Sequence, residues 1–209
     1  MILNSLLKKY PQLVHLKGNI LEAAEMLIYC YSTGGKVLVC GNGGSCSDAD
    51  HIVGELMKGF EKKRPVKGEL AEKLTGIGGE RGKYLSEKLQ QGLPAISLTV
   101  HNALITAVAN DIAGDLIFAQ QVIGYGNPGD ILIGLSTSGN SQNVIDAIIA
   151  AKAKGMKVIG MTGETGGKIK PFCDVLIPVP ETRTLSVQEL HLPVYHTLCL
   201  MVENHFFEK

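Results

Sequence analysis

Five short apolar segments recur along the chain, and stretches with helical spacing lie between them. The apolar segments are residues 37–40, 95–99, 131–135, 157–161 and 175–179. Short buried runs that alternate with helical patterns are typical of a parallel sheet whose two faces are covered by helices. The pattern therefore predicts an α/β fold.

A helical pattern precedes the first of these segments. Apolar residues recur there at spacings of three and four, at Leu13, Leu16, Ile20, Ala23, Ala24 and Leu27. This spacing predicts an amphipathic helix over about residues 12–33, ended by Gly34-Gly35. Such a helix can pack on a sheet or on a second subunit.

Residues 62–91 break the pattern, because they hold eight lysines or arginines and four glutamates with few large apolar residues. We expect a charged helical hairpin inserted into the domain. One alternative is a solvent-exposed projection without a role in the site. The other is a lid or a subunit-contact arm that carries a substrate-binding cation such as Arg81.

The composition limits the domain count and the class of partner. The chain has 209 residues, 45% of them hydrophobic, which suits one domain, residues 1–209. Twenty basic and twenty acidic residues leave no net charge to attract nucleic acid over long range. No apolar run approaches the roughly 18 residues of a membrane span, and five irregularly spaced cysteines suit reduced thiols. We therefore expect a cytoplasmic protein that binds neither nucleic acid nor membrane.

Two of the predicted strands run into loops of similar chemistry. Residues 37–40 lead into Gly41-Asn42-Gly43-Gly44-Ser45, and residues 131–135 lead into Ser136-Thr137-Ser138-Gly139-Asn140-Ser141. Glycines allow close approach of a ligand, hydroxyls donate hydrogen bonds, and a helix N-terminus favours negative charge. In open parallel sheets ligands bind beyond the carboxyl ends of strands. Both loops are therefore candidate sites for a phosphorylated substrate.

Titratable residues follow the first loop and recur near the C-terminus. His51 and Glu55 are four residues apart, so on a helix they project from one face. Residues 186–189 have the pattern of a capping box that opens a helix, with Gln188 in its first turn. His196 lies roughly 80° from Gln188 around that helix and His191 roughly 60° the other way, so spacing does not decide between them.

A further candidate pair is Asn110-Asp111, which ends an apolar stretch. The pair either forms an ordinary helix end or supplies a carboxylate that accepts hydrogen bonds from sugar hydroxyls.

Taken together, the two loops, residues 158–163 (VIGMTG) and residues 188–191 (QELH) resemble the sugar isomerase (SIS) domain family. The resemblance covers nearly the whole chain apart from residues 66–91. It implies a flavodoxin-like, three-layer fold with a five-stranded parallel sheet, and a homotetramer with sites between subunits. It also implies an isomerase that converts sedoheptulose 7-phosphate to D-glycero-D-manno-heptose 7-phosphate for bacterial surface polysaccharides.

The resemblance also implies roles for individual residues. One Zn²⁺ ion per subunit would be held by His51, Glu55, Gln188 and His196, with Glu55 also the catalytic base and His196 the acid. The residues expected to bind the substrate are Asn42, Gly43, Gly44, Ser45, Glu55, Asn110, Asp111, Ser136, Thr137, Ser138, Ser141 and Gln188.

Two positions depart from the family pattern. Gly59 stands where the family usually has an arginine, and Leu185 where it usually has an aspartate. Lys58, Arg64 or the inserted segment could replace the arginine. These departures leave open an isomerase of another phosphosugar. A further alternative is a binding protein like the DnaA initiator-associating relative, which lacks the metal and acid–base residues.

Overall fold

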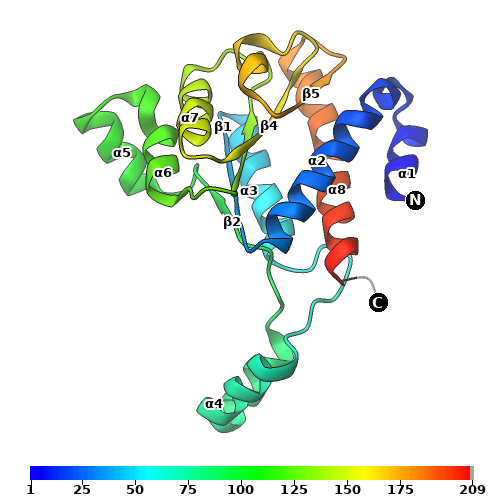
Figure 1. Cartoon of the computed structure of the whole chain (residues 1–209), viewed down its shortest axis with the longest axis vertical. Helices are drawn as coiled ribbons and strands as arrows, with labels where there is room; N and C mark the ends of the chain where they lie inside the picture. The colour runs from blue at the N-terminus through cyan, green and yellow to red at the C-terminus, as the bar shows by residue number, and fades with distance from the viewer. Residues whose placement is uncertain (208–209) are drawn as a thin grey trace.

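The computed structural model describes residues 1–207 and contains a five-stranded parallel sheet with strand order β2-β1-β3-β4-β5 (Figure 1). Its strands are β1 (Val37–Gly41), β2 (Ala95–Ser97), β3 (Ile131–Leu135), β4 (Lys157–Gly163) and β5 (Val175–Val179). All four pairings are parallel. The predicted α/β class and all five predicted strands are thus confirmed, with β2 two residues shorter than the apolar segment that predicted it.

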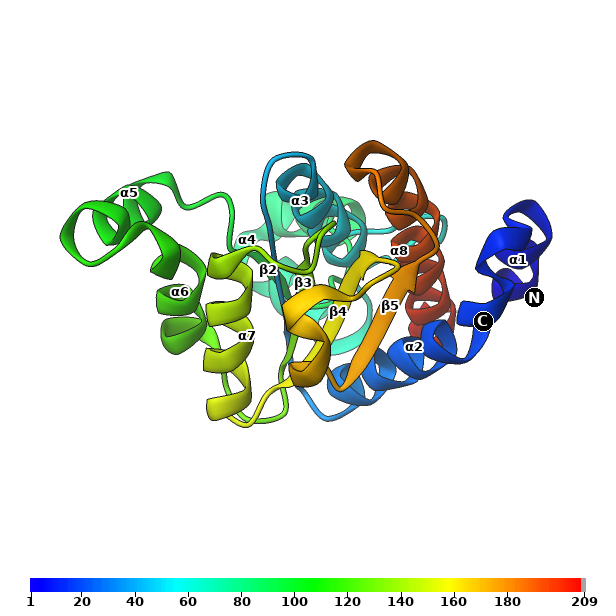
Figure 2. The same ribbon diagram turned by 90° about the horizontal axis from the view of Figure 1, so that it is seen from above.

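Helices cover both faces of the sheet, which gives three layers (Figure 2). One face packs against α2 (Lys17–Ser32), α3 (Gly44–Met57) and α8 (Thr184–Phe207), and α1 (Ile2–Lys9) lies on α8. The other face packs against α6 (Ile117–Tyr125) and α7 (Gln142–Ala153), while α5 (Asn102–Asp111) projects beyond α6. Short 3₁₀ turns are η1 (Pro11–Leu16), η2 (Gly114–Leu116) and η3 (Gly167–Phe172).

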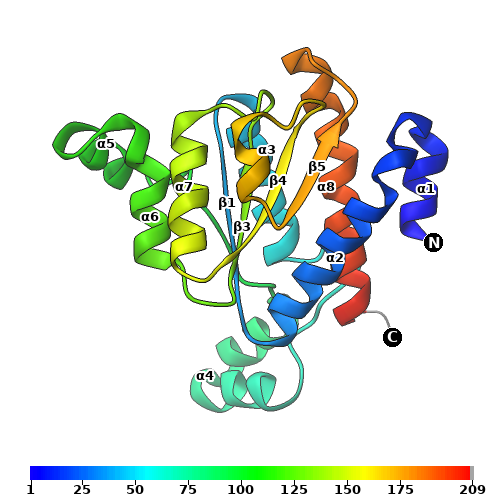
Figure 3. The ribbon, with the colours of Figure 1, turned by 45° about the horizontal axis from the view of Figure 1, so that its top comes forward.

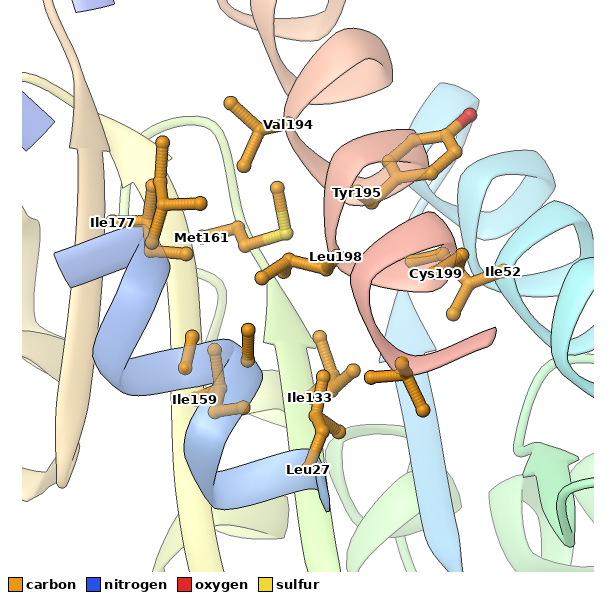
Figure 4. Close-up of a cluster of buried hydrophobic side chains, with 14 of the residues drawn as sticks. Leu27, Ile52, Ile133, Ile159, Met161, Ile177, Val194, Tyr195, Leu198 and Cys199 are labelled. Carbon is orange, nitrogen blue, oxygen red and sulfur yellow. The ribbon is translucent and has the colours of Figure 1, made fainter. Parts of the chain in front are cut away.

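The alternation of side chains along each strand supplies two separate cores. Val37 and Val39 of β1 face α2, α3 and α8, whereas Leu38 and Cys40 face the α6 and α7 layer. Successive residues of a strand point to opposite faces, so a strand buried on both sides must be apolar throughout. Figure 4 shows the first core, where α2, α3 and α8 meet the sheet.

The predicted first helix is confirmed as α2, but its start is not. Residues 11–16 form the 3₁₀ turn η1, and the α-helix begins at Lys17. Pro11 starts the 3₁₀ turn and has no N–H to donate. Gly34 follows the helix with φ 81°, as expected for the glycine that ends it.

The charged segment 62–91 contains α4 (Gly68–Lys88), which projects away from the sheet and the other helices (Figures 1 and 3). Gly79 interrupts this helix with φ 53° and ψ −129°, so the chain folds back as two short helices. An antiparallel β-bridge between Pro65 and Gln90 joins the two segments that connect α4 to the rest of the domain. This projection is called the α4 arm below.

The start of the last helix differs from its prediction. The helix begins at Thr184, so Ser186 and Glu189 lie inside α8 and do not form a capping box at its start. The N–H of Val187 already donates to the carbonyl of Arg183, which extends the helical turn upstream. Among residues 1–207, no helix is long and apolar enough to cross a membrane.

Candidate functional site

The loop after β1 leads directly into α3. Gly43 has φ 58° and precedes the first residue of the helix, Gly44. A side chain on Gly41 would collide with the backbone of Ser45, so the turn requires glycine there. Asn42, Gly43 and Gly44 are exposed, whereas Ser45 is buried. The loop therefore presents backbone and small side chains at the carboxyl end of the sheet.

The loop after β3 leads into α7 in the same way. The Ser136 and Ser141 hydroxyl oxygens are 3.0 Å apart, and Ser141 directly precedes the first residue of α7. Ser138 accepts a hydrogen bond from the N–H of Asn140 and is exposed, and Thr137 is half-buried. Hydroxyls thus gather at a helix N-terminus, an arrangement that suits an anion.

A pair of amide side chains joins the two loops. Asn42 donates to Asn143 at 2.8 Å, and Asn143, in the first turn of α7, donates back at 2.9 Å. Strands β1 and β3 are neighbours, and the chain leaves β1 toward β2 on its other side. The two loops therefore flank the switch point of the sheet, where ligands bind in open α/β folds.

Three titratable side chains meet between α3 and α8. His51 Nε2 is 3.2 Å from Glu55 Oε1 and 3.4 Å from His196 Nε2. The rings of His51 and His196 meet edge to face, with centroids 4.9 Å apart. His196 reaches this position from the middle of α8, which packs beside α3. Partial burial, followed by the neighbouring His51, lowers the pKa of His196, and Glu55 opposes that shift.

Glu55 has one carboxylate oxygen free for chemistry. Its buried Oε2 has no hydrogen-bond partner among the described residues, although Lys58 Nζ lies 3.8 Å away. An unsatisfied buried oxygen is costly in a protein interior, and a catalytic role is one explanation for it. Lys58, whose side chain is 61% exposed, thus places a cation beside this carboxylate.

The structure distinguishes between His191 and His196, which their helical spacing from Gln188 could not do. His191 is fully buried, faces the carbonyl of Thr162 with Nε2 at 3.2 Å, and lies in the core. Burial lowers the pKa of His191 to about 4, so its imidazole is neutral. His196, in contrast, is beside His51. Of the two, His196 is therefore the one near the other candidate site residues.

Gln188 lies apart from the three titratable residues. Its side-chain amide packs against Gly44, in the space that a Cβ at Gly44 would occupy. Gly44 starts α3, whereas His51 and Glu55 lie two to three turns further along the helix. Gln188 therefore contacts the first loop, whereas His51 contacts both Glu55 and His196.

The donors at this site match the chemistry of Zn²⁺. Imidazole nitrogens and carboxylate oxygens are common zinc ligands, and tetrahedral bonds of about 2.0–2.1 Å place neighbouring donors roughly 3.3–3.4 Å apart. The distances from His51 Nε2 to Glu55 and His196, 3.2 and 3.4 Å, agree with that spacing. Within residues 1–207 no group of three or more such ligands converges on one metal position, so these side chains would have to rotate to hold a metal.

The two departures from the family pattern have different surroundings. A side chain on Gly59 would meet the carbonyl of Lys62 and the side chain of Gln90, and Leu185 is exposed. Arg64 is fully buried on Glu203, so it cannot replace the missing arginine. Arg81 lies on the α4 arm with its guanidinium over the Tyr84 ring. Lys58 lies 3.8 Å from the carboxylate of Glu55, whereas Arg64 donates to the backbone carbonyl of that residue.

Asn110 and Asp111 lie elsewhere in the chain. They end α5, where Asn110 donates to Asp111 at 2.7 Å. Helix α5 projects on the side of the molecule opposite α8 (Figures 1 and 2). One copy of the chain therefore does not bring this pair to His51, Glu55 and His196.

Sequence reasoning did not identify Asp48 and Tyr195, which contact the site. Asp48 lies three residues before His51 on the same face of α3, and this spacing could have found it. Tyr195 precedes His196, and its hydroxyl lies between Asp48 and His51. No sequence signal marked Tyr195, because its contact depends on the packing of α8 against α3.

Comparison with protein families matches this chain to the SIS domain over residues 4–91 and 85–163. Among curated proteins, the phosphoheptose isomerase of Rhodospirillum rubrum is 43% identical over 185 residues, which cover 88% of this chain and 85% of the relative. The phosphoheptose isomerase of Shewanella sediminis is 40% identical over 195 residues, which cover 92% of this chain and 86% of that relative.

Solved structures of similar proteins share the fold. A phosphoheptose isomerase from Francisella tularensis superposes with a TM-score of 0.75 at 33% identity, covering 96% of this chain and 94% of that chain. The phosphoheptose isomerase from Neisseria gonorrhoeae gives a TM-score of 0.73 at 36% identity, covering 90% of this chain and 87% of that chain.

Proposed function

Because the chain belongs to the SIS domain family and, within it, to the phosphoheptose isomerases, we propose that it isomerises sedoheptulose 7-phosphate to D-glycero-D-manno-heptose 7-phosphate. The observation that supports this reaction most directly is the meeting of His51, Glu55 and His196 at 3.2 and 3.4 Å. The relatives are enzymes by name, and this chain carries the side chains that proton transfer needs.

Aldose–ketose isomerisation moves a proton between adjacent carbons through an enediol. Glu55, with Oε2 free of hydrogen bonds, takes the proton from the first carbon of the ketose and returns it to the second. His196 donates a proton to the carbonyl oxygen at the second carbon as the enediol forms. The hydroxyl on the first carbon of the enediol then returns a proton to His196 as the aldehyde forms, so the net reaction neither gains nor loses protons.

We also propose one Zn²⁺ ion per subunit, held by His51, Glu55 and His196. Bound there, the metal would stabilise the negative charge that develops on the substrate oxygens. The family resemblance adds Gln188 as a fourth ligand, and its side chain also lies against Gly44 of the first loop, where it could contact the sugar.

The two loops would hold the rest of the substrate. The hydroxyls of Ser136, Ser138 and Ser141, with Thr137 between them, surround the N-terminus of α7 and suit the phosphate. Asn42 and the residues that follow it place the sugar next to α3, the helix of His51 and Glu55.

We propose that the protein is a homotetramer whose sites lie between subunits. The position of Asn110 and Asp111, away from Glu55 within one copy, is what a shared site requires if these residues bind substrate. All five cysteines are free, which suits the cytoplasm as the compartment.

The test of the reaction is incubation of the zinc-loaded protein with a panel of ketose phosphates, with products followed by NMR. We expect turnover of sedoheptulose 7-phosphate, incorporation of solvent deuterium at the second carbon, and a Glu55→Gln variant that is folded but nearly inactive. A Glu22→Gln variant, which changes an exposed glutamate of α2, is the matched control and should keep full activity.

The outcomes separate the alternatives. Turnover of a different sugar phosphate alone would keep the chemistry and replace the substrate. Full activity of Glu55→Gln would remove Glu55 as the base. Absence of turnover across the panel, together with binding of a replication initiator, would favour the non-catalytic alternative.

Shared sites have their own test. Glu55→Gln and Asp111→Asn variants, each inactive alone, would regain part of the activity when their subunits are mixed, provided the two residues act in one site from different copies. Light scattering of the unmodified protein should give the mass of four chains, and a monomeric mass would contradict the assembly.

A further inference from the structure

Tyr195 links α8 to two residues of α3. Its ring is buried in the apolar core, with 1% of the residue exposed, and its hydroxyl points out of that core (Figure 4). The hydroxyl oxygen is 3.0 Å from Asp48 Oδ1 and 3.1 Å from His51 Nδ1. One phenol therefore contacts a carboxylate and an imidazole at the same time.

The number of protons available fixes the direction of these hydrogen bonds. The phenol has one proton, and an ionised carboxylate can only accept, so Tyr195 donates to Asp48. A phenol ordinarily loses its proton only at about pH 10, so Tyr195 keeps this proton at neutral pH. His51 Nδ1 must then carry the hydrogen and donate it to the phenol oxygen.

We propose that Tyr195, held by Asp48, is a positioning residue that fixes His51 in the tautomer with hydrogen on Nδ1 and leaves Nε2 as an acceptor. The surroundings of the imidazole support this assignment. The Tyr195 ring meets the rings of His51 and His196 edge to face, with centroids 5.6 and 5.0 Å away, so it also holds the orientation of both imidazoles.

The consequence lies at Nε2, which faces Glu55 Oε1 at 3.2 Å and His196 Nε2 at 3.4 Å. In the metal-free protein, His196 Nε2 can donate a hydrogen to the lone pair on His51 Nε2, and a bound cation would offset the charge of the facing Glu55 carboxylate. A hydrogen bond on the far nitrogen is the usual way in which proteins orient a metal-binding histidine. The link to metal rests on the proposed function, whereas the tautomer of His51 does not.

The tautomer can be measured without metal or substrate. Long-range ¹H–¹⁵N correlation spectra of the metal-free protein, with labelled histidine at pH 8, distinguish the protonated ring nitrogen from the unprotonated one. A His51→Asn variant identifies the His51 signals. We expect Nδ1 of His51 to be the protonated nitrogen in the unmodified protein.

Two variants test the cause. Tyr195→Phe removes the hydroxyl and keeps the ring, and Asp48→Asn removes the obligatory acceptor and keeps the tyrosine. Both should lower the fraction of His51 with hydrogen on Nδ1. Tyr29→Phe, which removes a hydroxyl from a tyrosine that is 71% exposed on α2, is the matched control and should leave the spectrum unchanged.

Zinc titration of the same proteins provides the second readout. Tyr195→Phe should bind Zn²⁺ about 10- to 100-fold more weakly, as is typical when a residue that hydrogen-bonds to a metal ligand is removed. Failure of the unmodified protein to bind Zn²⁺, with the expected tautomer, would reject the proposed metal and keep the role of Tyr195. A His51 protonated on Nε2, or a tautomer unchanged in both variants, would overturn the inference.

Discussion

Arg64 and Glu203 form a fully buried ion pair, with Nη2 of the arginine 2.8 Å from Oε1 of the glutamate. The carboxylate also accepts hydrogen bonds from the backbone N–H groups of residues 60, 61 and 62. The guanidinium donates to the carbonyls of Glu55 and Leu56 as well. The pair therefore fastens the end of α3 and the segment after it to the last turns of α8.

Glu203→Gln should destabilise the protein strongly, because it leaves the Arg64 charge buried without a counter-charge. The expected loss in the free energy of unfolding is about 3–5 kcal/mol, measured by urea denaturation. Glu69→Gln is the control: the Lys73–Glu69 pair is exposed, so its removal should cost no more than about 1 kcal/mol. Equal small losses in both variants would show that the buried pair contributes little.

His191 should make stability depend on pH. Burial lowers the pKa of His191 to about 4, so the folded state binds its proton less tightly than the unfolded state, whose value is near 6.5. The contribution is complete above pH 6.5 and is lost as the pH falls from 6.5 toward 4, by roughly 3 kcal/mol in all.

Urea denaturation between pH 8 and pH 5 measures this slope. His191→Gln keeps a side-chain amide that can donate to the Thr162 carbonyl and should flatten the slope. His15→Gln, at an exposed histidine, should retain it. A slope that survives in His191→Gln would assign the pH dependence to other groups.

Ser141→Ala should weaken binding of the substrate phosphate. A hydrogen bond to a charged group contributes about 1.5–3 kcal/mol, so KM should rise roughly 10- to 100-fold while kcat changes little. Steady-state kinetics with the substrate, and inhibition by inorganic phosphate, measure this effect. Ser86→Ala, on the α4 arm, is the control and should keep the original KM. An unchanged KM for Ser141→Ala would place the phosphate elsewhere.

Gly59→Ala should destabilise the turn after α3. The new Cβ would contact the Lys62 carbonyl and the Gln90 side chain, so the backbone would have to shift, at about 1–3 kcal/mol. Gly54→Ala places the same methyl group inside α3, where nothing lies within 4 Å, and should stabilise by about 0.5–1 kcal/mol. Thermal unfolding of both variants provides the comparison, and a neutral Gly59→Ala would mean that the turn yields easily.

The parts of the structure that sequence could predict are those determined by local pattern. The five strands follow from apolar runs, and the two loops follow from glycines and hydroxyls at the ends of β1 and β3. The spacing of His51 and Glu55 placed both on one face of a helix, and their side chains are in contact. These features need no information from distant residues.

Features that depend on distant residues were not predictable. Arg64 stands in a run of basic residues that suggests a solvated surface, and it is buried because Glu203, 139 positions away, meets it there. The start of α8 was placed three residues too late, because a capping-box pattern occurs inside the helix. The arrangement of His51, His196 and Tyr195 likewise arises only when α3 packs against α8.

The reciprocal amide bonds between Asn42 and Asn143 make the two loops mechanically dependent on each other. Neither loop can swing outward alone without breaking both hydrogen bonds, at a cost of about 0.5–1.5 kcal/mol for each. The two hydrogen bonds therefore link the first turn of α7 to the loop that precedes α3. An outward movement of one loop must therefore either break both hydrogen bonds or carry the other loop with it.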